Sequence, residues 1–159
     1  MKDYKKEYRE FSLSVPERFS FPLDVFDKWG DRTALFWTDD SVEKKLSFNE
    51  LKLLSSKGAG ALRKMGIGKG DKVLVMLPNI PEWWEMMLSF MRLNAIPIPA
   101  TTLLTLRDIE YRLKATDIKA IICTDEDDSK VKEAVSKSSS SKSIIKNIGD
   151  GDGGINYLR

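Results

Sequence analysis

The chain has 159 residues, of which 42% are hydrophobic, and this length and composition suit about one compact domain. Lysine and arginine number 26 against 24 acidic residues, so the formal charge of +2 gives no electrostatic argument for nucleic acid or an anionic membrane as partner. The sequence contains no histidine and one cysteine, which exclude a Ser-His-Asp triad, histidine-ligated zinc and an internal disulfide within these residues.

The chain begins with an arm and a predicted short helix. Tyr4, Tyr8 and Phe11 recur at about one helical turn, a spacing typical of a short amphipathic helix. Residues 21–29 predict a further helix, because four apolar residues share one side or its edge and Gly30 follows as a C-terminal stop. These apolar residues are Leu23, Val25, Phe26 and Trp29.

A hairpin and an amphipathic helix are predicted next. Residues 34–38 and 45–48 predict two strands around a polar connection. Asn49 is the predicted start of a helix with the clearest apolar stripe in the sequence. Gly58 and Gly60 lower its helix propensity but allow another backbone to approach closely. The stripe consists of Leu51, Leu54, Gly58, Ala61, Leu62 and Met65.

Residues 66–71 resemble a phosphate-binding glycine loop in composition. Such a loop needs a strand before the glycines and a helix after them, so that the helix amides face the anion. Here the predicted order is helix, glycines, strand. We therefore assign Gly66 to a left-handed helix end, and Gly68 and Gly70 to the turn into the strand.

Residues 73–77 form an unbroken apolar run, which predicts a strand covered on both faces, as in parallel sheets. The following helix is predicted to start with Asn79 as cap, Pro81 in the first turn and Glu82 in a capping box. Its polar stripe is narrow, so we expect cover around most of the helix and a packing role for the Trp83–Trp84 pair. The stripe consists of Glu82, Glu85, Ser89 and Arg92.

Another strand, helix and strand are predicted after this helix. Asn94 suits a left-handed helix end. Residues 96–99 are strand-like but contain two prolines, which places them where ladder donors are dispensable. Thr105 and Asp108 have the spacing of a helix start, and residues 119–124 predict a further apolar strand.

The remaining residues predict a last helix and strand. Cys123 is expected to be a small core residue rather than a nucleophile. Apolar positions within residues 131–135 indicate the helix, residues 138–141 a serine linker, and residues 143–148 a final strand. Residues 149–154 are expected to form a surface loop rather than a calcium site, because the terminal glutamate of such a site is missing.

These elements predict an α/β fold, a Rossmann-like parallel sheet flanked by helices and preceded by a helix and a β-hairpin. We divide the chain into an arm, hairpin and helix at residues 1–70 and parallel βα units at residues 71–159. The acidic run of residues 125–128 follows the carboxyl end of a predicted strand, where such sheets bind ligands. It is either a solvated turn or a receiver-like acidic pocket.

Several motifs, in order, resemble the N-terminal part of AMP-forming acyl-CoA synthetases, in the adenylate-forming superfamily. The PEWW and RDIEYRL sequences and the closing GGINYLR resemble the medium-chain branch in particular. Asn94 stands where relatives usually have glycine, a conservative exchange at a left-handed position. The motifs are LSFNEL at 46–51, GIGKGDKVLVMLPNIPEWWEMML at 66–88, RLNAIPIPATTLLTLRDIEYRL at 92–113 and KAIICTDE at 119–126.

The resemblance implies an enzyme that uses ATP, Mg²⁺ and coenzyme A to convert a medium-chain or branched carboxylic acid into its thioester. It also implies that this chain is an N-terminal portion of the large domain, without the ATP-binding core and the C-terminal domain. We therefore expect no catalytic or metal-binding residue here, no bound cofactor and no activity of the chain alone. The family's coenzyme A phosphate contacts correspond to the neighbourhood of Lys130 and Lys132.

Two alternatives belong to other functional classes. One is a stand-alone binding module of flavodoxin-like or receiver-like topology, and the other is a non-catalytic interaction subunit that associates through the tryptophan-rich helix. A synthetase portion is expected to expose apolar surface and to self-associate. The single cysteine and the absence of an apolar stretch after Met1 favour a cytoplasmic setting, and no stretch is long enough to span a membrane.

Overall fold

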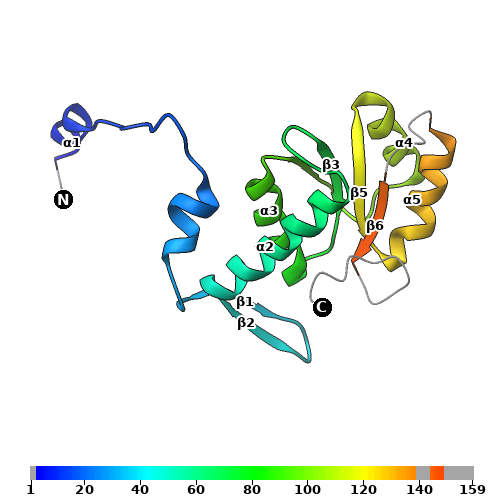
Figure 1. Ribbon diagram of the computed structural model, residues 1–159, viewed down its shortest axis with the longest axis horizontal. Helices are drawn as coiled ribbons and strands as arrows, with labels where there is room; N and C mark the ends of the chain where they lie inside the picture. The colour runs from blue at the N-terminus through cyan, green and yellow to red at the C-terminus, as the bar shows by residue number, and fades with distance from the viewer. Residues whose placement is uncertain (1–2, 139–143, 149–159) are drawn as a thin grey trace.

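The computed structural model describes residues 3–138 and 144–148 and shows a parallel α/β unit with an extended N-terminal arm (Figure 1). Its α-helices are α1 Tyr4–Glu10, α2 Phe48–Lys64, α3 Pro81–Leu93, α4 Leu106–Ala115 and α5 Asp125–Lys137. Its strands are β1 Thr33–Thr38, β2 Glu43–Ser47, β3 Lys72–Met76, β4 Ile96–Pro99, β5 Ile118–Thr124 and β6 Ile144–Ile148.

The four-stranded sheet confirms the predicted α/β fold. Its strand order is β4-β3-β5-β6, and every neighbouring pair is parallel. The side chains of β3 alternate between two core clusters: Val73 and Val75 pack with residues of α2 and α3, whereas Leu74 and Met76 pack with residues of α4 and α5. The sheet is thus covered on both faces, which explains the continuous apolar run of β3.

The edge strand β4 lies where its prolines are tolerated. Pro97 and Pro99 align with Val73 and Val75 of β3, and β4 has no strand on its other side among the described residues. The preceding helix ends at Asn94 in the predicted left-handed conformation, with φ +53°. Both features are confirmed. Asn tolerates the left-handed conformation at a helix end, and an edge strand such as β4 needs fewer backbone amide donors than a central one.

The antiparallel hairpin of β1 and β2 is also confirmed, but the starts of two helices differ from prediction. Helix α2 is capped by Ser47 in a capping box with Glu50, so Asn49 lies inside the first turn. Helix α3 follows Ile80 without a side-chain cap, so the predicted capping role of Asn79 is wrong. Pro81 at the first position supplies a preset φ instead, and its missing amide needs no cap.

The segment predicted as one helix at residues 21–29 consists of two shorter turns. These are η1, a π-type turn at Phe21–Val25, and η2, a 3-10 turn at Phe26–Lys28. Gly30 ends the segment with φ +65° as predicted. Leu23 and Trp29 are exposed rather than buried, whereas Phe26 packs against the core. Trp29 stacks on the Phe48 ring, which Phe26 also contacts.

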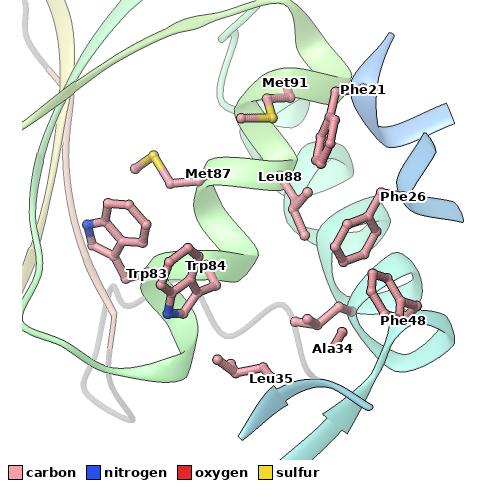
Figure 2. A pocket seen from close by; sticks show the side chains of 11 residues that line it. Phe21, Phe26, Ala34, Leu35, Phe48, Trp83, Trp84, Met87, Leu88 and Met91 are labelled. Carbon is pink, nitrogen blue, oxygen red and sulfur yellow. The ribbon is translucent and has the colours of Figure 1, made fainter. Parts of the chain in front are cut away.

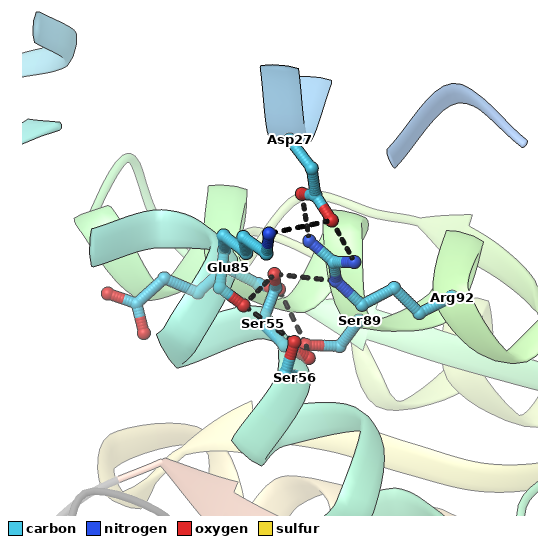
Figure 3. Close-up of polar contacts among 7 residues, drawn as sticks. Asp27, Ser55, Ser56, Glu85, Ser89 and Arg92 are labelled. Carbon is cyan, nitrogen blue, oxygen red and sulfur yellow. Dashed lines mark hydrogen bonds and ion pairs between the residues drawn. The ribbon is translucent and has the colours of Figure 1, made fainter. Parts of the chain in front are cut away.

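Part of the polar stripe of α3 faces inward, in keeping with the expected cover around most of the helix. Glu85 and Ser89 are buried against α2, and the Ser89 hydroxyl donates hydrogen bonds to the carbonyls of Ser55 and Glu85 (Figure 3). A Cβ at Gly58 would overlap the Ser89 hydroxyl, so Gly58 has the predicted close-approach role. Gly60 does not, since nothing lies within 4 Å of its Cβ position.

A buried ion pair continues this polar interface to η2. Arg92 of α3 forms two hydrogen bonds to Asp27, of 3.0 and 2.6 Å, and both side chains are only 9% exposed (Figure 3). The Arg92 Nε also donates to the Ser55 hydroxyl at 2.9 Å, and Lys52 lies 4.0 Å from Asp27. The polar stripe of α3 therefore joins α2, α3 and η2.

The glycine-rich segment before β3 forms the predicted helix end and turn. Gly66 and Gly70 have φ values of +85° and +81°, which glycine adopts without strain, whereas Gly68 does not need this conformation. The turn is held by Asp71, which accepts hydrogen bonds from the Gly68 amide at 2.7 Å and the Lys119 ammonium at 2.6 Å. These contacts support a structural role for this segment.

Some predictions fall outside the described residues or remain predictions. The linker beyond Ser138 and the loop at residues 149–154 lie outside the described part of the chain. The division at residue 70 stays a prediction, although α2 and α3 contribute to the same core cluster across it. None of the helices within the described ranges has the length and apolar character needed to cross a bilayer.

Candidate functional site

The candidate site is the carboxyl edge of the sheet between β3 and β5. The chain leaves β3 through α3 on one face to reach β4, and returns through α4 on the other face to β5. Such a reversal of direction creates a crevice beyond the carboxyl ends of the two strands, where open α/β sheets bind ligands. The loop of residues 77–80 and the start of α5 border this position.

The β-hairpin is fastened to this edge by two long-range contacts. The Trp37 indole donates a 2.8 Å hydrogen bond to the carbonyl of Asn79, and Lys44 lies 3.9 Å from Glu82 at the start of α3. Asn79 thus contributes its backbone to hairpin docking rather than its side chain to a helix cap. The contacts fix the hairpin beside the loop that follows β3.

Two apolar cavities meet at the tryptophan pair of α3. A cavity of about 250 Å³ lies at the loop after β3, and one of about 560 Å³ lies between α3, the hairpin and η1 (Figure 2). Trp83 and Trp84 line both, in an edge-to-face arrangement with centroids 4.8 Å apart. Trp83 is half-buried against the core and Trp84 is exposed, so the predicted packing role describes Trp83 better than Trp84.

Lys130 and Lys132 both lie on α5 and are engaged with its own carboxylates. The Lys130 ammonium lies 2.7 Å from Asp127 and donates a 2.9 Å hydrogen bond to the carbonyl of Thr102. Lys132 pairs with Asp128 at 2.5 Å. The Lys130 side chain is 30% exposed and that of Lys132 is 63% exposed, so Lys132 is the more accessible of the two.

The acidic run of residues 125–128 forms the first turn of α5 and not a separate turn. Carboxylates at this position interact favourably with the helix N-terminus. Across residues 3–138 and 144–148, no group of three or more His, Cys, Asp or Glu side chains is arranged to hold a metal ion. The described residues therefore do not fit a magnesium site, and a receiver-like pocket is not formed.

Cys123 is confirmed as a core residue. Its side chain is fully buried in β5, and burial, followed by the carboxylates of α5, raises the pKa of its thiol to about 12. A nucleophilic cysteine needs the opposite shift, towards the thiolate at neutral pH. This thiol is therefore structural.

Sequence reasoning missed the larger cavity and the docking of the hairpin. The lining of this cavity comes from η1, η2, β1, α2 and α3, which are separated in the sequence. One signal was available in the sequence. Helix α3 has more apolar residues than are needed to cover one face of a core, which indicates a second apolar surface on it. Figure 2 shows Trp84, Met87 and Met91 of α3 along one side of the cavity.

A family model described as AMP-binding enzyme matches residues 24–155. The chain belongs to the AMP-binding enzyme family. Among curated relatives, the mitochondrial acyl-coenzyme A synthetase ACSM3 of Mus musculus is 40% identical over an aligned length of 134 residues, and the match covers 77% of this chain and 23% of the relative. The mitochondrial acyl-coenzyme A synthetase ACSM4 of Rattus norvegicus is 41% identical over 70% of this chain and 21% of its own length.

Solved structures of AMP-binding enzymes share the fold. The acyl-CoA synthetase of Brucella canis superposes with a TM-score of 0.77 at 21% identity, over 99% of this chain and 31% of that protein. An anthranilate CoA ligase in complex with anthranoyl-AMP gives 0.74 at 20% identity, over 90% and 27%. The chain thus spans less than a quarter of the length of the first curated relatives and about 30% of the length of these two solved proteins. The predicted resemblance to acyl-CoA synthetases is confirmed.

Proposed function

We propose that the full-length protein is an AMP-forming acyl-CoA synthetase. The observation that carries this proposal is the family match over residues 24–155, together with 40% identity to the acyl-coenzyme A synthetase ACSM3 of Mus musculus. A stand-alone flavodoxin-like or receiver-like module is disfavoured, because its acidic pocket is not formed by the described residues. An interaction subunit has no specific observation in its favour.

The proposed reaction has two steps. A carboxylate oxygen attacks the α-phosphorus of ATP, the bond to the bridging oxygen breaks, and pyrophosphate leaves the acyl-adenylate. The thiol of coenzyme A then loses its proton and attacks the acyl carbon, which gives the thioester and AMP. Mg²⁺ is proposed to accompany the ATP phosphates, whose charge a divalent cation neutralises.

The proposed part of this chain is structural support at the entrance for substrates. The sheet edge between β3 and β5, the hairpin fastened to it and the Trp83–Trp84 pair form one side of an apolar passage. Apolar walls of this kind suit an acyl chain or the pantetheine arm of coenzyme A. Medium-chain or branched acids are the proposed substrates, on the basis of the resemblance of the PEWW, RDIEYRL and GGINYLR sequences to the medium-chain branch.

Lys130 and Lys132 are proposed to approach the 3′-phosphate of coenzyme A. Their position on the helix after β5 supports this, because that helix begins at the ligand-binding edge. The four carboxylates of residues 125–128 oppose an anion there, and Lys132 has to exchange its partner Asp128 for the phosphate. An exposed ion pair of this kind contributes about 0–1 kcal/mol, so the exchange is energetically accessible.

The activity is tested with the full-length protein, ATP, coenzyme A and a series of carboxylic acids from two to sixteen carbons. The expected products are AMP, pyrophosphate and an acyl-CoA, detected by mass spectrometry, with the highest kcat/KM among medium-chain acids. Formation of ADP and phosphate, or no acid-dependent turnover across the series, would contradict the proposal. The 159-residue chain alone is expected to give no product.

The lysine proposal is tested by Lys132→Ala with coenzyme A and with coenzyme A lacking the 3′-phosphate. The variant is expected to raise KM for coenzyme A several-fold and to leave KM for the dephosphorylated form unchanged. Lys137→Ala is the matched control, because Lys137 is also paired with a carboxylate on α5 but lies at the far end of the helix. Equal effects of Lys132→Ala on both forms would refute a phosphate contact.

A cytoplasmic location remains a proposal that rests on the single cysteine. The names of these curated relatives include the word mitochondrial, which places those proteins in the mitochondrion rather than the cytoplasm. A tagged full-length protein expressed in its own cells should separate with the cytoplasmic fraction on this proposal. Recovery in a membrane-bounded organelle would overturn it.

A further inference from the structure

Lys130 links two elements that follow different strands at the carboxyl edge of the sheet. Its ammonium donates a 2.9 Å hydrogen bond to the carbonyl of Thr102 and lies 2.7 Å from the Asp127 carboxylate. Thr102 belongs to the loop of residues 100–105, which follows β4, whereas Asp127 lies in the first turn of α5, which follows β5. Since β3 lies between β4 and β5 in the sheet, the contact joins elements from both sides of β3.

The loop of residues 100–105 is fixed at both ends by other contacts. At its start, the Ala100 amide donates a 2.9 Å hydrogen bond to a backbone carbonyl of β3. At its end, Leu104 is buried in the core and Thr105 caps α4. Lys130 meets the loop between these two anchors, although it lies 28 positions away in the sequence. Its contact therefore holds the middle of the loop against α5.

The Lys130 ammonium is held more firmly than that of Lys132. Its side chain is 30% exposed, against 63% for Lys132, and its two partners belong to different elements. Lys132 pairs with Asp128 on its own helix. Hydrogen bonds from an ammonium to oxygen acceptors are also stronger than those between neutral groups. These differences favour a role for Lys130 in holding the loop, besides the charge that it presents near the proposed phosphate position.

We propose that Lys130 is a positioning residue for coenzyme A, which it serves by fixing the loop of residues 100–105 as one wall of the crevice beyond β3. This inference rests on the proposed acyl-CoA synthetase function. The loop lies at the edge where open α/β sheets bind ligands. Helix α4, into which it leads, packs with α5 on the same face of the sheet (Figure 1). A wall that is already ordered lowers the entropic cost of binding.

The kinetic test compares coenzyme A with coenzyme A lacking the 3′-phosphate in the full-length protein. Lys130→Met is expected to raise KM for both forms by the same factor, about three- to tenfold, the effect of one lost hydrogen bond. KM for the carboxylic acid should stay unchanged. Lys130→Arg keeps a cationic donor and should recover most of the loss. An effect confined to the phosphorylated form would overturn the proposal, because Lys130 would then act on the phosphate.

Hydrogen exchange of the loop amides provides a measurement that does not depend on activity. In the full-length protein, Lys130→Met should accelerate exchange at residues 101–104 by about three- to tenfold and leave β3 unchanged. Lys132→Ala is the matched control, because Lys132 pairs within α5. Equal loop exchange in Lys130→Met and the unmodified protein would overturn the proposal. A full-length protein that forms no acyl-CoA would overturn the proposed function instead, and faster loop exchange would then still support the contact.

Discussion

Replacing Gly58 with alanine is expected to destabilise the chain although alanine favours helices. The new methyl group would overlap the Ser89 hydroxyl and approach the Met86 Cε to 2.9 Å. Displacing Ser89 breaks its bonds to the carbonyls of Ser55 and Glu85. The gain in helix propensity is about 1 kcal/mol, whereas overpacking costs about 1–3 kcal/mol and a buried unpaired hydroxyl a further 1–3 kcal/mol. The net loss is therefore about 1–5 kcal/mol.

Gly60→Ala is the matched control on the same helix. Its Cβ position is open and its φ is ordinary, so this substitution should stabilise the chain by about 0.5–1 kcal/mol. Urea unfolding with an unchanged m-value measures both effects. Adding Ser89→Ala to Gly58→Ala removes the overlapping oxygen and should recover part of the loss. If Gly58→Ala were as stable as Gly60→Ala, the close packing of α2 on α3 would be refuted.

Three further predictions concern buried and paired groups. Arg92→Met should lower the free energy of unfolding, measured with urea, by about 3 kcal/mol, because it leaves the buried Asp27 carboxylate without its bidentate partner. A decrease of less than about 0.5 kcal/mol would contradict this. The Lys119 ammonium, and then the Gly68 amide, lower the pKa of Asp71 below its usual 3.8, so its stabilising contribution is present above that pH and disappears as pH falls through the lowered value. Asp71→Asn should therefore flatten the loss of stability measured between pH 5 and 2, and an unchanged acid limb would argue against the pairing. Cys123 should resist a thiol reagent at pH 8 in the folded chain and react after unfolding; rapid labelling of the native state would show that it is accessible.

Much of the fold was predictable because its signals are local. The apolar run of β3, the capping box of Thr105 with Asp108 and the left-handed end at Asn94 depend on residues close in sequence. The structure shows all three. The predicted helix starts at Asn49 and Asn79 were wrong because a neighbouring residue starts each helix. Ser47 caps α2, and α3 begins at Pro81 without a side-chain cap.

The partners of the polar stripe of α3 were not predicted, because they lie far away in the sequence. Arg92 contacts Asp27, 65 residues earlier in the chain, and Ser89 contacts the backbone of α2. The absence of a side chain at Gly58 makes room for this contact. Periodicity locates a stripe on a helix, but it does not say whether a distant partner covers it.

The candidate site was predictable only in outline. The carboxyl edge of the sheet follows from strand order, and Lys130 and Lys132 lie on the helix expected from the sequence. Their pairing with Asp127 and Asp128 was not anticipated, because the acidic run was interpreted as a turn or pocket rather than the first turn of a helix. The cavity of about 560 Å³ beside α3 was missed because five separate elements form it.

Isotope exchange between pyrophosphate and ATP tests the central claim most directly. The full-length protein should incorporate labelled pyrophosphate into ATP only when a carboxylic acid is present, and coenzyme A should not be required, because adenylation precedes thioester formation. Exchange that proceeds without any acid, or none with any acid of the series in a folded full-length preparation, would contradict the assignment of this chain to an acyl-CoA synthetase.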